Sequence, residues 1–284
     1  DKSYYKFDKT LLMGRILFKK DLKNVSRFTN KKIKRSLWTC LIPAAGRGTR
    51  LGYILPKVLY PILEKPILHY LVQLFEDYCT QFIVVASPEG AQKIEKELKN
   101  CCNSKNFSVA IQEEPKGMAH AVWQAKDIIQ TPYTVVVWGD QICLRDETIS
   151  STLAFHQFGT KNALTFPTVI KRDPYIHFQR DYSGRIIKVL QKRENEITEE
   201  FGETDCGFFG FSTNLLFSVL QNGFRSPMSL GAQTKEVNLL QLFPKFEIRN
   251  FHVNSLRIAY EEETLGINTL MDAKKASSIL RNRK

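Results

Sequence analysis

The sequence predicts one α/β domain over residues 37–284, with a mostly parallel but mixed sheet that is flanked by helices. From Leu37 onward, short apolar segments alternate with stretches of helical periodicity. Several apolar segments are continuous, as in residues 82–86, and strands that are buried on both faces have this composition. A glycine-rich stretch follows the first apolar segment, at the position where open α/β sheets bind ligands.

The expected strands are runs of β-branched and other apolar residues, and the expected helices carry apolar residues three or four positions apart. Strands are predicted at residues 37–43, 82–87, 108–113, 134–139, 162–170, 186–191 and 206–212. Helices are predicted at residues 66–78, 90–99, 118–130, 146–158, 213–222, 234–243 and 267–282. The sequence contains no internal repeat, which excludes a solenoid or a propeller.

Residues 1–36 do not join this alternation, yet they carry most of the positive charge. The whole chain has a formal net charge of +12, and residues 1–36 hold twelve Lys or Arg against three Asp. The charge therefore says little about the chemistry of the domain. We expect a basic N-terminal extension or the remnant of an upstream region, with one or two short helices over residues 11–22. Binding of nucleic acid is the less favoured alternative, because no aromatic stacking platform accompanies the charge.

The rest of the composition favours a cytoplasmic protein. The longest apolar runs, such as residues 134–138, are too short to span a bilayer, and no signal peptide is recognisable, although the sequence begins at Asp1. The six cysteines, at positions 40, 79, 101, 102, 143 and 206, form no CxxC pair and no zinc-binding spacing. We therefore expect a protein of a reducing compartment that binds neither membranes nor nucleic acid. The oligomeric state is left open.

The strongest local motif is a glycine-rich segment, Leu41-Ile42-Pro43-Ala44-Ala45-Gly46-Arg47-Gly48-Thr49-Arg50-Leu51, which is followed by Pro56-Lys57. Its glycines let the backbone turn sharply and bring N–H groups up to phosphate oxygens. Arg50 can fork onto phosphate oxygens and Lys57 adds a compact positive charge, so the segment can neutralise a nucleotide. It has neither the GxxxxGK[ST] of a Walker loop nor the third glycine of a Rossmann fingerprint. The residues expected to contact the nucleotide are Ala44, Ala45, Gly46, Gly48, Thr49, Arg50 and Lys57.

This segment resembles the opening motif of the sugar-nucleotide pyrophosphorylases, nucleotidyltransferases with a Rossmann-like, GT-A-like fold. Within that family the chain looks closest to the N-acetylglucosamine-1-phosphate uridyltransferases, from about Leu37 to its C-terminal end. The resemblance implies an enzyme that joins a sugar 1-phosphate to a nucleoside monophosphate from a pyrimidine NTP and releases pyrophosphate, with Mg²⁺ as cofactor. In that reaction Arg50 would hold the departing β- and γ-phosphates, and Lys57 would hold the α-phosphate.

A second motif is expected to read the base. The segment Gln112-Glu113-Glu114-Pro115-Lys116-Gly117-Met118-Ala119-His120-Ala121 resembles the family pattern Q-x4-G-[TL]-[AG]-[HQ]-A. The resemblance implies that Gln112 and the backbone of Gly117 pair with a pyrimidine edge, with Met118 beside them. Met118 stands where the uridyltransferases commonly have threonine, so UTP, CTP and dTTP all stay open. We expect His120, on the helix that follows, to be structural.

Two further segments are expected to form a metal site. The apolar run 135–138 leads into Gly139-Asp140, and a carboxylate at the end of a central strand is well placed to hold Mg²⁺ between phosphates. The family has a Gly-Asp pair here, which implies a metal-binding and catalytic role for Asp140. Leu265–Thr269 resembles the family's G-V-N segment and implies Asn268 as the second metal ligand, although Asn268 could instead cap the last helix.

The acceptor-binding residues rest on weaker resemblances. Residues 182–186 are similar to the family's G-R-[IV] segment, which implies that Gly184 approaches the sugar. Gln191-Lys192 stands where many members have Glu followed closely by Lys, and Asp205-Cys206-Gly207 stands in place of Asn-x-Gly. Glu236-Val237-Asn238-Leu239 resembles an E-x-x-L segment near the sugar. The residues that these segments imply are Gly184, Lys192, Gly207 and Glu236.

Three alternatives to a sugar-1-phosphate nucleotidyltransferase stay open. A related cytidylyltransferase could act on a non-sugar phosphate such as phosphocholine, because Met118 and Gln191 depart from the family pattern. A non-catalytic regulatory domain of the same fold is disfavoured because Arg50, Lys57 and Asp140 are all present. A glycosyltransferase of similar fold would normally show an Asp-x-Asp motif, whereas Gln141 and Ile142 follow Asp140.

Overall fold

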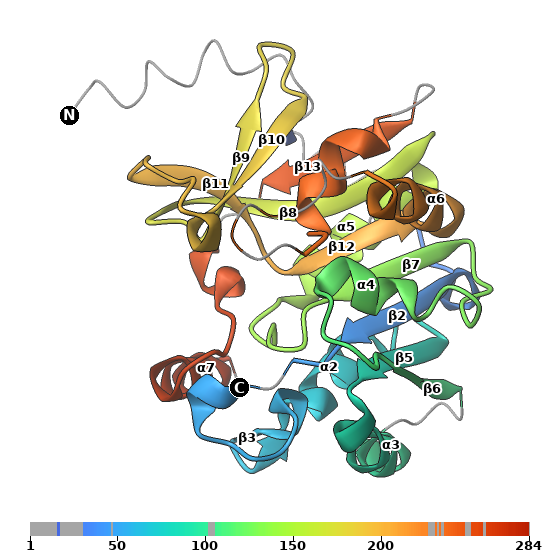
Figure 1. Cartoon of the computed structure of the whole chain (residues 1–284), viewed down its shortest axis with the longest axis vertical. Helices are drawn as coiled ribbons and strands as arrows, with labels where there is room; N and C mark the ends of the chain where they lie inside the picture. The colour runs from blue at the N-terminus through green and yellow to red at the C-terminus, as the bar shows by residue number, and fades with distance from the viewer. Residues whose placement is uncertain are drawn as a thin grey trace.

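The architecture is a mixed sheet with helices on both faces (Figure 1). The computed structural model describes residues 16–17, 31–46, 48–101, 106–226, 231, 233, 236–247, 251–257 and 260–283. Over these residues the main sheet has the strand order β1-β13-β8-β12-β7-β2-β5-β6, and β11 pairs with β8. The strands are β1 (Ile16–Leu17), β2 (Trp38–Pro43), β5 (Gln81–Ala86), β6 (Phe107–Ile111), β7 (Tyr133–Val137), β8 (Asn162–Arg172), β11 (Phe201–Asp205), β12 (Phe208–Ser212) and β13 (His252–Arg257).

The middle of this sheet is parallel. Strand β2 runs parallel to β5 and to β7, and β5 runs parallel to β6. Strand β12 enters antiparallel between β7 and β8, while β13 is parallel to β8. All six residues of β2 are buried, as are all but the first of β5, which is why these segments are continuously apolar. The predicted α/β fold with a mixed, mostly parallel sheet is confirmed.

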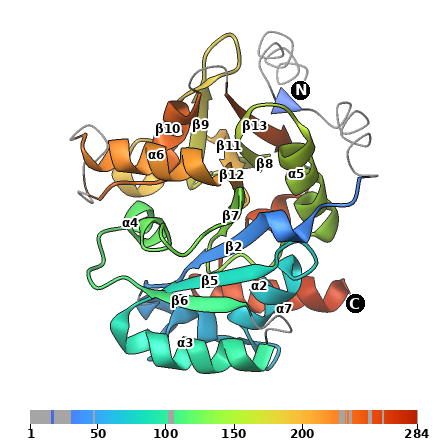
Figure 2. The same cartoon turned by 90° about the vertical axis from the view of Figure 1, so that its right-hand side faces the viewer.

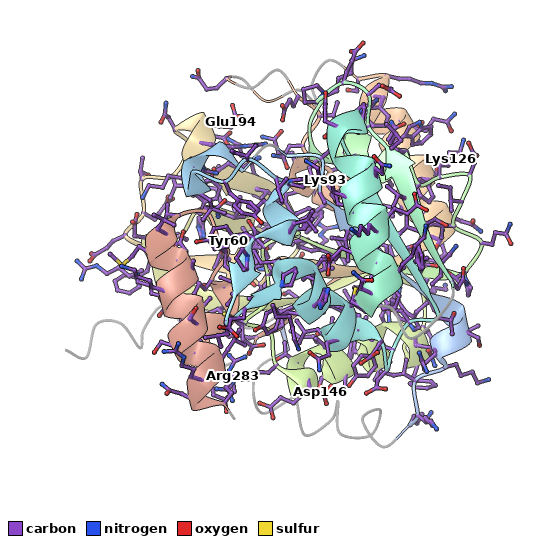
Figure 3. All side chains as sticks on the ribbon, turned by 90° about the horizontal axis from the view of Figure 1, so that it is seen from below. Tyr60, Lys93, Lys126, Asp146, Glu194 and Arg283 are labelled. Carbon is purple, nitrogen blue, oxygen red and sulfur yellow. The ribbon has the colours of Figure 1, made fainter. Side chains whose placement is uncertain are left out.

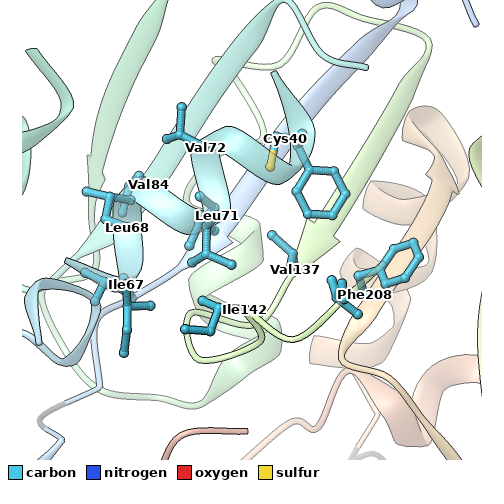
Figure 4. Packing of buried hydrophobic residues seen from close by; sticks show 14 of the residues in the cluster. Cys40, Ile67, Leu68, Leu71, Val72, Val84, Val137, Ile142 and Phe208 are labelled. Carbon is cyan, nitrogen blue, oxygen red and sulfur yellow. The ribbon is translucent and has the colours of Figure 1, made fainter. Parts of the chain in front are cut away.

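Side chains from alternate positions of the central strands enter two separate cores, one on each face of the sheet. Cys40 and Ile42 pack on one face with α2, α3, α5 and α7, whereas Leu41 packs on the other with α4 and α6 (Figure 2). Figure 4 shows the first core, where Leu71 of α2 lies close to Val137 of β7. The helices are α2 (Ile67–Phe75), α3 (Pro88–Cys101), α4 (Met118–Trp123), α5 (Asp146–Phe158), α6 (Thr213–Phe224) and α7 (Leu270–Asn282).

Shorter elements complete the domain. A separate antiparallel hairpin stands beside the main sheet, and another very short one lies near α2. These are β9 (Ile176–Arg180) with β10 (Ile186–Gln191), and β3 (Pro61–Ile62) with β4 (Lys65–Pro66). The 3-10 helices are η1 (Arg35–Leu37), η2 (Thr49–Leu51), η3 (Lys57–Leu59), η4 (Lys192–Glu194), η6 (Leu240–Phe246) and η7 (Glu261–Thr264). None of the helices in the described part of the chain has the length and hydrophobicity of a membrane span.

Several predicted elements differ from the observed ones. Strands β9, β11 and β13 were not predicted, because polar residues interrupt their apolar patterns, as in His252–Arg257. The helix expected at 234–243 is wrong where it is described: the chain forms η6 at Leu240–Phe246, which contains Pro244. Ile16–Leu17, expected in a helix, forms β1 beside β13. The rest of the expected N-terminal helices, and residues 234–235, lie outside the described residues.

Candidate active site

The carboxyl ends of β2 and β7 bring the glycine-rich loop and Asp140 to the same edge of the sheet. The two strands are parallel neighbours, so the segments that follow Pro43 and Val137 leave the sheet side by side. At Gly139 an added Cβ would lie 2.9 Å from Val58 Cγ1 and 3.2 Å from the Pro43 carbonyl oxygen. Only glycine therefore lets the turn after β7 pack this closely against the loop after β2.

The glycine-rich loop folds back onto Lys57. Gly48 has φ +42°, and an added Cβ there would lie 2.9 Å from Lys57 Cβ, so both its conformation and its size favour glycine. Gly46 faces open space. Ala44 and Gly46 line the cleft described below, whereas Ala45 does not, and the backbone of Thr49 forms the start of η2.

The basic side chains predicted to bind phosphate contact the side chains predicted to bind the metal. Lys57 contacts both Asp140 and Asn268, and Arg50 contacts Asn268. Lys57 Nζ donates to Asp140 Oδ2 at 2.5 Å and to Asn268 Oδ1 at 3.2 Å. Arg50 donates from a terminal guanidinium nitrogen to the same Asn268 oxygen at 3.2 Å. The Lys57 and Asp140 side chains are 21% and 14% exposed, so the ion pair is shielded but not sealed from the solvent. Residues as much as 218 positions apart in the chain thus meet at one point.

The N-terminus of α7 holds Asn268 in this cluster. Thr269 and Asp272 form a capping box, in which Thr269 Oγ1 accepts from Asp272 N and Asp272 Oδ2 accepts from Thr269 N. The same Asp272 oxygen also accepts from Asn268 N at 3.1 Å. The adjacent Ile267 N donates to the Asp140 carbonyl oxygen at 3.1 Å, and this hydrogen bond joins the segment before α7 to the segment after β7. Asn268 is therefore not the N-cap residue of α7, since Thr269 has that role.

A cleft of about 580 Å³ opens around this cluster. Among its lining residues are Pro43, Ala44, Gly46, Arg50, Lys57, Met118, Trp138, Gly139, Asp140, Gln141, Tyr175, Ile176, Gln191, Arg193, Thr204, Asp205, Asn238 and Asn268. These residues come from the ends of β2, β7, β10 and β11, from the starts of β9 and α4, from η2, η3 and η4, and from the segments before η6 and α7. The cleft thus extends from the glycine-rich loop to the foot of the β9–β10 hairpin.

The segment predicted to read the base leads into the start of α4. Gly117 has φ +90° and precedes the helix, and an added Cβ would lie 2.8 Å from the Glu236 side chain. Gln112 is buried and donates from Nε2 to the Gly117 carbonyl oxygen at 3.1 Å. Of the residues assigned to the base, Met118 lines the cleft, whereas Gln112 and Gly117 are not among its lining residues. Glu236 packs against Gly117 and does not line the cleft either.

Elsewhere in the lining of the cleft, two buried side-chain amides each have one polar atom without a hydrogen-bond partner among the described residues. Gln191 is 1% exposed, and its Oε1 accepts from Asn238 and Arg193 while its Nε2 has no partner. Gln141 is also buried, and its Oε1 has no partner. Its side chain packs on Gly207, where φ is +74° and an added Cβ would overlap Gln141. An unpaired buried donor and acceptor are costly; both residues line the cleft, although the two atoms themselves have less than 1 Å² of accessible surface each.

The cleft is also lined by a buried acid, Asp205. Its Oδ1 accepts from Gly207 N at 2.7 Å, and the residue is 8% exposed. Burial, with a smaller effect from the nearby charge of Asp140, raises the pKa of Asp205 to about 6 in spite of that hydrogen bond. Gly207, assigned from the sequence to the acceptor, thus shapes the positions of Gln141 and Asp205 and does not itself line the cleft.

Two of the residues assigned to the acceptor lie away from the cleft. Gly184 is in the turn at the far end of the β9–β10 hairpin, where Asp181 Oδ1 accepts from two backbone N–H groups of the turn. Lys192 donates to Asp173 at 2.7 Å in an exposed ion pair. The cleft is lined instead by residues at the foot of the hairpin, namely Tyr175, Ile176, Gln191 and Arg193. The geometry therefore does not support Gly184 or Lys192 as acceptor-binding residues.

The sequence reasoning missed several cleft residues. Trp138, Gln141, Tyr175, Arg193 and Asn238 all line the cleft. Gln141 directly follows Asp140, and Arg193 directly follows Lys192. Considering the positions next to each motif residue would therefore have included both. Tyr175 carried no signal, because β9 was not predicted.

This fold and this cluster define the chain as a nucleotidyltransferase-like protein, and comparison with known proteins gives its family. Residues 40–203 match the MobA-like NTP transferase domain, and the chain belongs to that family. It is related to sugar-1-phosphate nucleotidyltransferases.

Two curated relatives and one solved structure illustrate the relationship. The bifunctional proteins GlmU of Bacillus cytotoxicus and Geobacillus thermodenitrificans are each 28% identical to the chain, over 86% of its length. The matched region spans 52% of each of these relatives, about half their length. A crystal structure of UDP-glucose pyrophosphorylase complexed with UDP-glucose shares the fold, with a TM-score of 0.65 and 17% identity over 88% of this chain and 100% of that one.

Proposed function

We propose that this chain transfers a nucleoside monophosphate from a pyrimidine NTP to the phosphate of a sugar 1-phosphate and releases pyrophosphate. The observation that carries the proposal is the contact of Lys57 with both Asp140 and Asn268, with Arg50 on the same Asn268 oxygen. Two cations and two oxygen ligands at the mouth of a cleft are what a triphosphate and a divalent ion require. The solved structure of the same fold that is described as a UDP-glucose pyrophosphorylase complexed with UDP-glucose supports the same class of substrate.

The proposed chemistry is an in-line displacement at the α-phosphorus. An oxygen of the acceptor phosphate forms a bond to the α-phosphorus, and the bond from that phosphorus to the bridging oxygen of the β-phosphate breaks. The leaving pyrophosphate takes the electron pair of that bond. A phosphate monoester is already anionic near neutral pH, so no residue has to act as a general base. Lys57 neutralises charge at the α-phosphate, and Arg50 holds the departing β- and γ-phosphates.

The donor set at Asp140 and Asn268 fits Mg²⁺. Both side-chain oxygens lie within hydrogen-bond distance of one atom, Lys57 Nζ, so they face a common point. Among the described residues, no group of three His, Cys, Asp or Glu side chains could hold a metal ion. The carboxylate oxygen of Asp140 and the amide oxygen of Asn268 suit Mg²⁺, which is commonly bound by one or two protein oxygens together with substrate phosphates and water. When bound, the ion would neutralise phosphate charge and polarise the phosphoryl oxygens.

The far wall of the cleft would hold the acceptor. Gln141, Gln191 and Asp205 all line this part of the cleft with polar side chains. Hydroxyl groups both donate and accept, so such a lining suits a polyhydroxylated molecule. A sugar 1-phosphate fits this wall and presents its phosphate toward Lys57 and Arg50.

The test is a measurement of pyrophosphate release with Mg²⁺ over a matrix of UTP, CTP and dTTP against sugar 1-phosphates and phosphocholine. We expect turnover with at least one sugar 1-phosphate. Lys57→Ala and Asp140→Asn should each lower kcat by ~10²-fold or more, the scale for removing one preorganised charge-stabilising group. Lys188→Ala is the matched control, because Lys188 is an exposed lysine that pairs with Glu196 on the hairpin.

The matrix also separates the alternatives. Turnover with phosphocholine and CTP alone would assign the chain to a non-sugar acceptor. Lack of turnover with every pair, in protein that still binds nucleotide, would favour a non-catalytic domain of this fold.

A further inference from the structure

Lys57 contacts the same two side-chain oxygens that are assigned to the metal ion. We propose that Lys57 is an internal counter-ion of this site. Before a nucleotide binds, its ammonium takes the place of the metal ion as the cation that Asp140 and Asn268 bind, so that Mg²⁺ enters only together with the triphosphate. The proposal rests on one part of the proposed function, the assignment of Asp140 and Asn268 as metal ligands.

The ammonium and a metal ion would compete for the same oxygens. Lys57 Nζ is 2.5 Å from Asp140 Oδ2 and 3.2 Å from Asn268 Oδ1. Mg²⁺ binds oxygen at about 2.1 Å, so an ion on Asp140 Oδ2 would lie within about 5 Å of Nζ whatever its direction of approach. The Lys57 and Asp140 side chains are only 21% and 14% exposed, so water screens the repulsion between the two cations poorly. The ion is therefore disfavoured while Lys57 stays on these oxygens.

The two oxygens belong to side chains that their surroundings hold in place. Gly266 lies against both: an added Cβ there would be 3.4 Å from Asp140 Cγ and 3.3 Å from Asn268 Nδ2. Asn268 Nδ2 donates to the Gly266 carbonyl oxygen at 3.4 Å, which leaves the amide oxygen for Lys57. The hydrogen bond from Ile267 N to the Asp140 carbonyl oxygen fixes the two backbones relative to each other. The oxygens are thus the fixed part of the contact.

The ammonium of Lys57 is the part that can move. Lys57 is held at the base of its side chain, where its Cβ lies close to Gly48 and its carbonyl oxygen accepts from Tyr60 N at 3.0 Å. The rest of the side chain is a flexible four-carbon stem, and the residue lines the cleft. Lys57 can therefore turn from Asp140 to a phosphate oxygen by changing its rotamer, without a movement of the backbone.

The balance of charge favours entry of the ion with the nucleotide. Free Mg²⁺ meets a carboxylate that Lys57 already neutralises, and it would have to leave the displaced ammonium without a partner. A Mg–NTP complex instead brings phosphate oxygens that accept from Lys57 while the ion replaces Lys57 on Asp140. Every charge then stays paired during the exchange, which is what a partly buried site requires. The metal ion and the triphosphate should therefore bind with strong positive coupling.

The test is the binding of free Mn²⁺, a paramagnetic substitute for Mg²⁺, followed by electron paramagnetic resonance without nucleotide or acceptor. Lys57→Met keeps a side chain of similar length without the charge, and it should tighten Mn²⁺ binding by about tenfold or more. Lys57→Arg keeps the charge and should bind Mn²⁺ as weakly as the wild type. Adding Asp140→Asn to Lys57→Met should abolish the gain. Lys188→Met, which removes an exposed lysine of the β9–β10 hairpin, is the matched control.

The wild-type protein gives a second measurement that does not depend on the folding of a variant. Free Mg²⁺ at millimolar concentration should leave its Tm unchanged, because the ion does not bind without the triphosphate. A rise in Tm that Asp140→Asn abolishes would overturn the proposal.

Two results with Mn²⁺ would also overturn it. One is an equal Mn²⁺ affinity in the wild type and in a Lys57→Met variant that circular dichroism shows to be folded. The other is a gain in affinity that survives Asp140→Asn. Because these measurements do not depend on turnover, a chain that shows the gain but turns over no substrate pair would refute the proposed function and leave this inference standing.

Discussion

At the scale of single residues, Asp205 shows a conflict between stability and binding. It is a buried acid on the cleft wall, and burial raises its pKa from 3.8 to about 6. A raised pKa means that the folded state binds a proton more tightly than the unfolded state. The stability that this group contributes is therefore present below about pH 4 and is lost as the pH rises through about 6. At neutral pH the charged carboxylate of Asp205 therefore lowers the stability of the folded state.

We predict that Asp205→Asn stabilises the apo protein at pH 8 by ~1–3 kcal/mol, because an amide of the same shape avoids the buried charge. Its oxygen can still accept from Gly207 N. At pH 4.5, between the unfolded pKa of 3.8 and the folded pKa of about 6, the difference should be clearly smaller. Urea denaturation with EDTA at both pH values measures this, and an equal difference at the two values would contradict it. The same variant should weaken binding of the acceptor.

Gln191 tests whether the far wall binds the acceptor. Gln191→Leu removes the unpaired Nε2, so we predict that kcat/KM for the acceptor falls about tenfold while the KM for the NTP changes little. Gln157→Leu is the matched control, since Gln157 accepts from the Trp38 indole N–H away from the cleft. Gln157→Leu should lower stability without changing the KM for the acceptor. Equal effects of the two variants on that KM would argue against an acceptor site at Gln191.

The same wall shows why the motifs placed side chains in the cleft at one end and away from it at the other. Asp140 and Asn268 lie in segments whose backbone is fixed by glycine packing and by a helix cap, so the residue type in the motif defines its place. At the end of β10, however, a shift of one residue moves a side chain to the other face. Gln191 therefore points into the cleft, and its neighbour Lys192 points out to Asp173.

At the scale of elements, the cap of α7 is both a structural and a functional feature. Thr269→Ala should lower stability by ~1 kcal/mol, the usual cost of a lost N-cap side chain. Because Asp272 holds both Thr269 and Asn268, we also predict that the variant needs more Mg²⁺ for its half-maximal rate. Thr269→Ser keeps the hydroxyl and should behave like the wild type. A Thr269→Ala variant that loses stability but keeps its Mg²⁺ requirement would separate the cap from the metal site.

The elements that carry the proposed phosphate and metal residues were the most predictable from the sequence. Strands β2 and β7 are buried on both faces, so their composition is unambiguous. Strand β9 alternates apolar and polar residues, strand β13 has polar residues on both faces, and both were missed. The partner of β13 is far away in sequence, as with His252 and Asn162, so local patterns do not report the pairing that makes it a strand.

At the scale of the whole molecule, contacts of residues 262–283 with residues 144–148 hold the segments that carry Asp140 and Asn268 together. Arg283, at the end of α7 (Figure 3), donates to the Leu144 carbonyl and to Glu262, and Arg145 donates to the same glutamate. The adjacent Glu263 is fully buried and accepts from Arg145 N and Thr148 Oγ1. These contacts fasten η7 and the segment before Asn268 to the loop that follows Asp140.

A cluster assembled from distant segments exists only in the folded chain, so its ligand should stabilise the whole domain. With Mg–UTP at 100 times its Kd, linkage predicts ~2.7 kcal/mol of added stability. For a domain of this size that corresponds to a rise in Tm of roughly 5–10 °C. In Lys57→Ala most of this rise should vanish, and in the Lys188→Ala control it should persist. A Lys57→Ala variant with the full rise in Tm would mean that the triphosphate is held elsewhere, whatever the turnover of that variant.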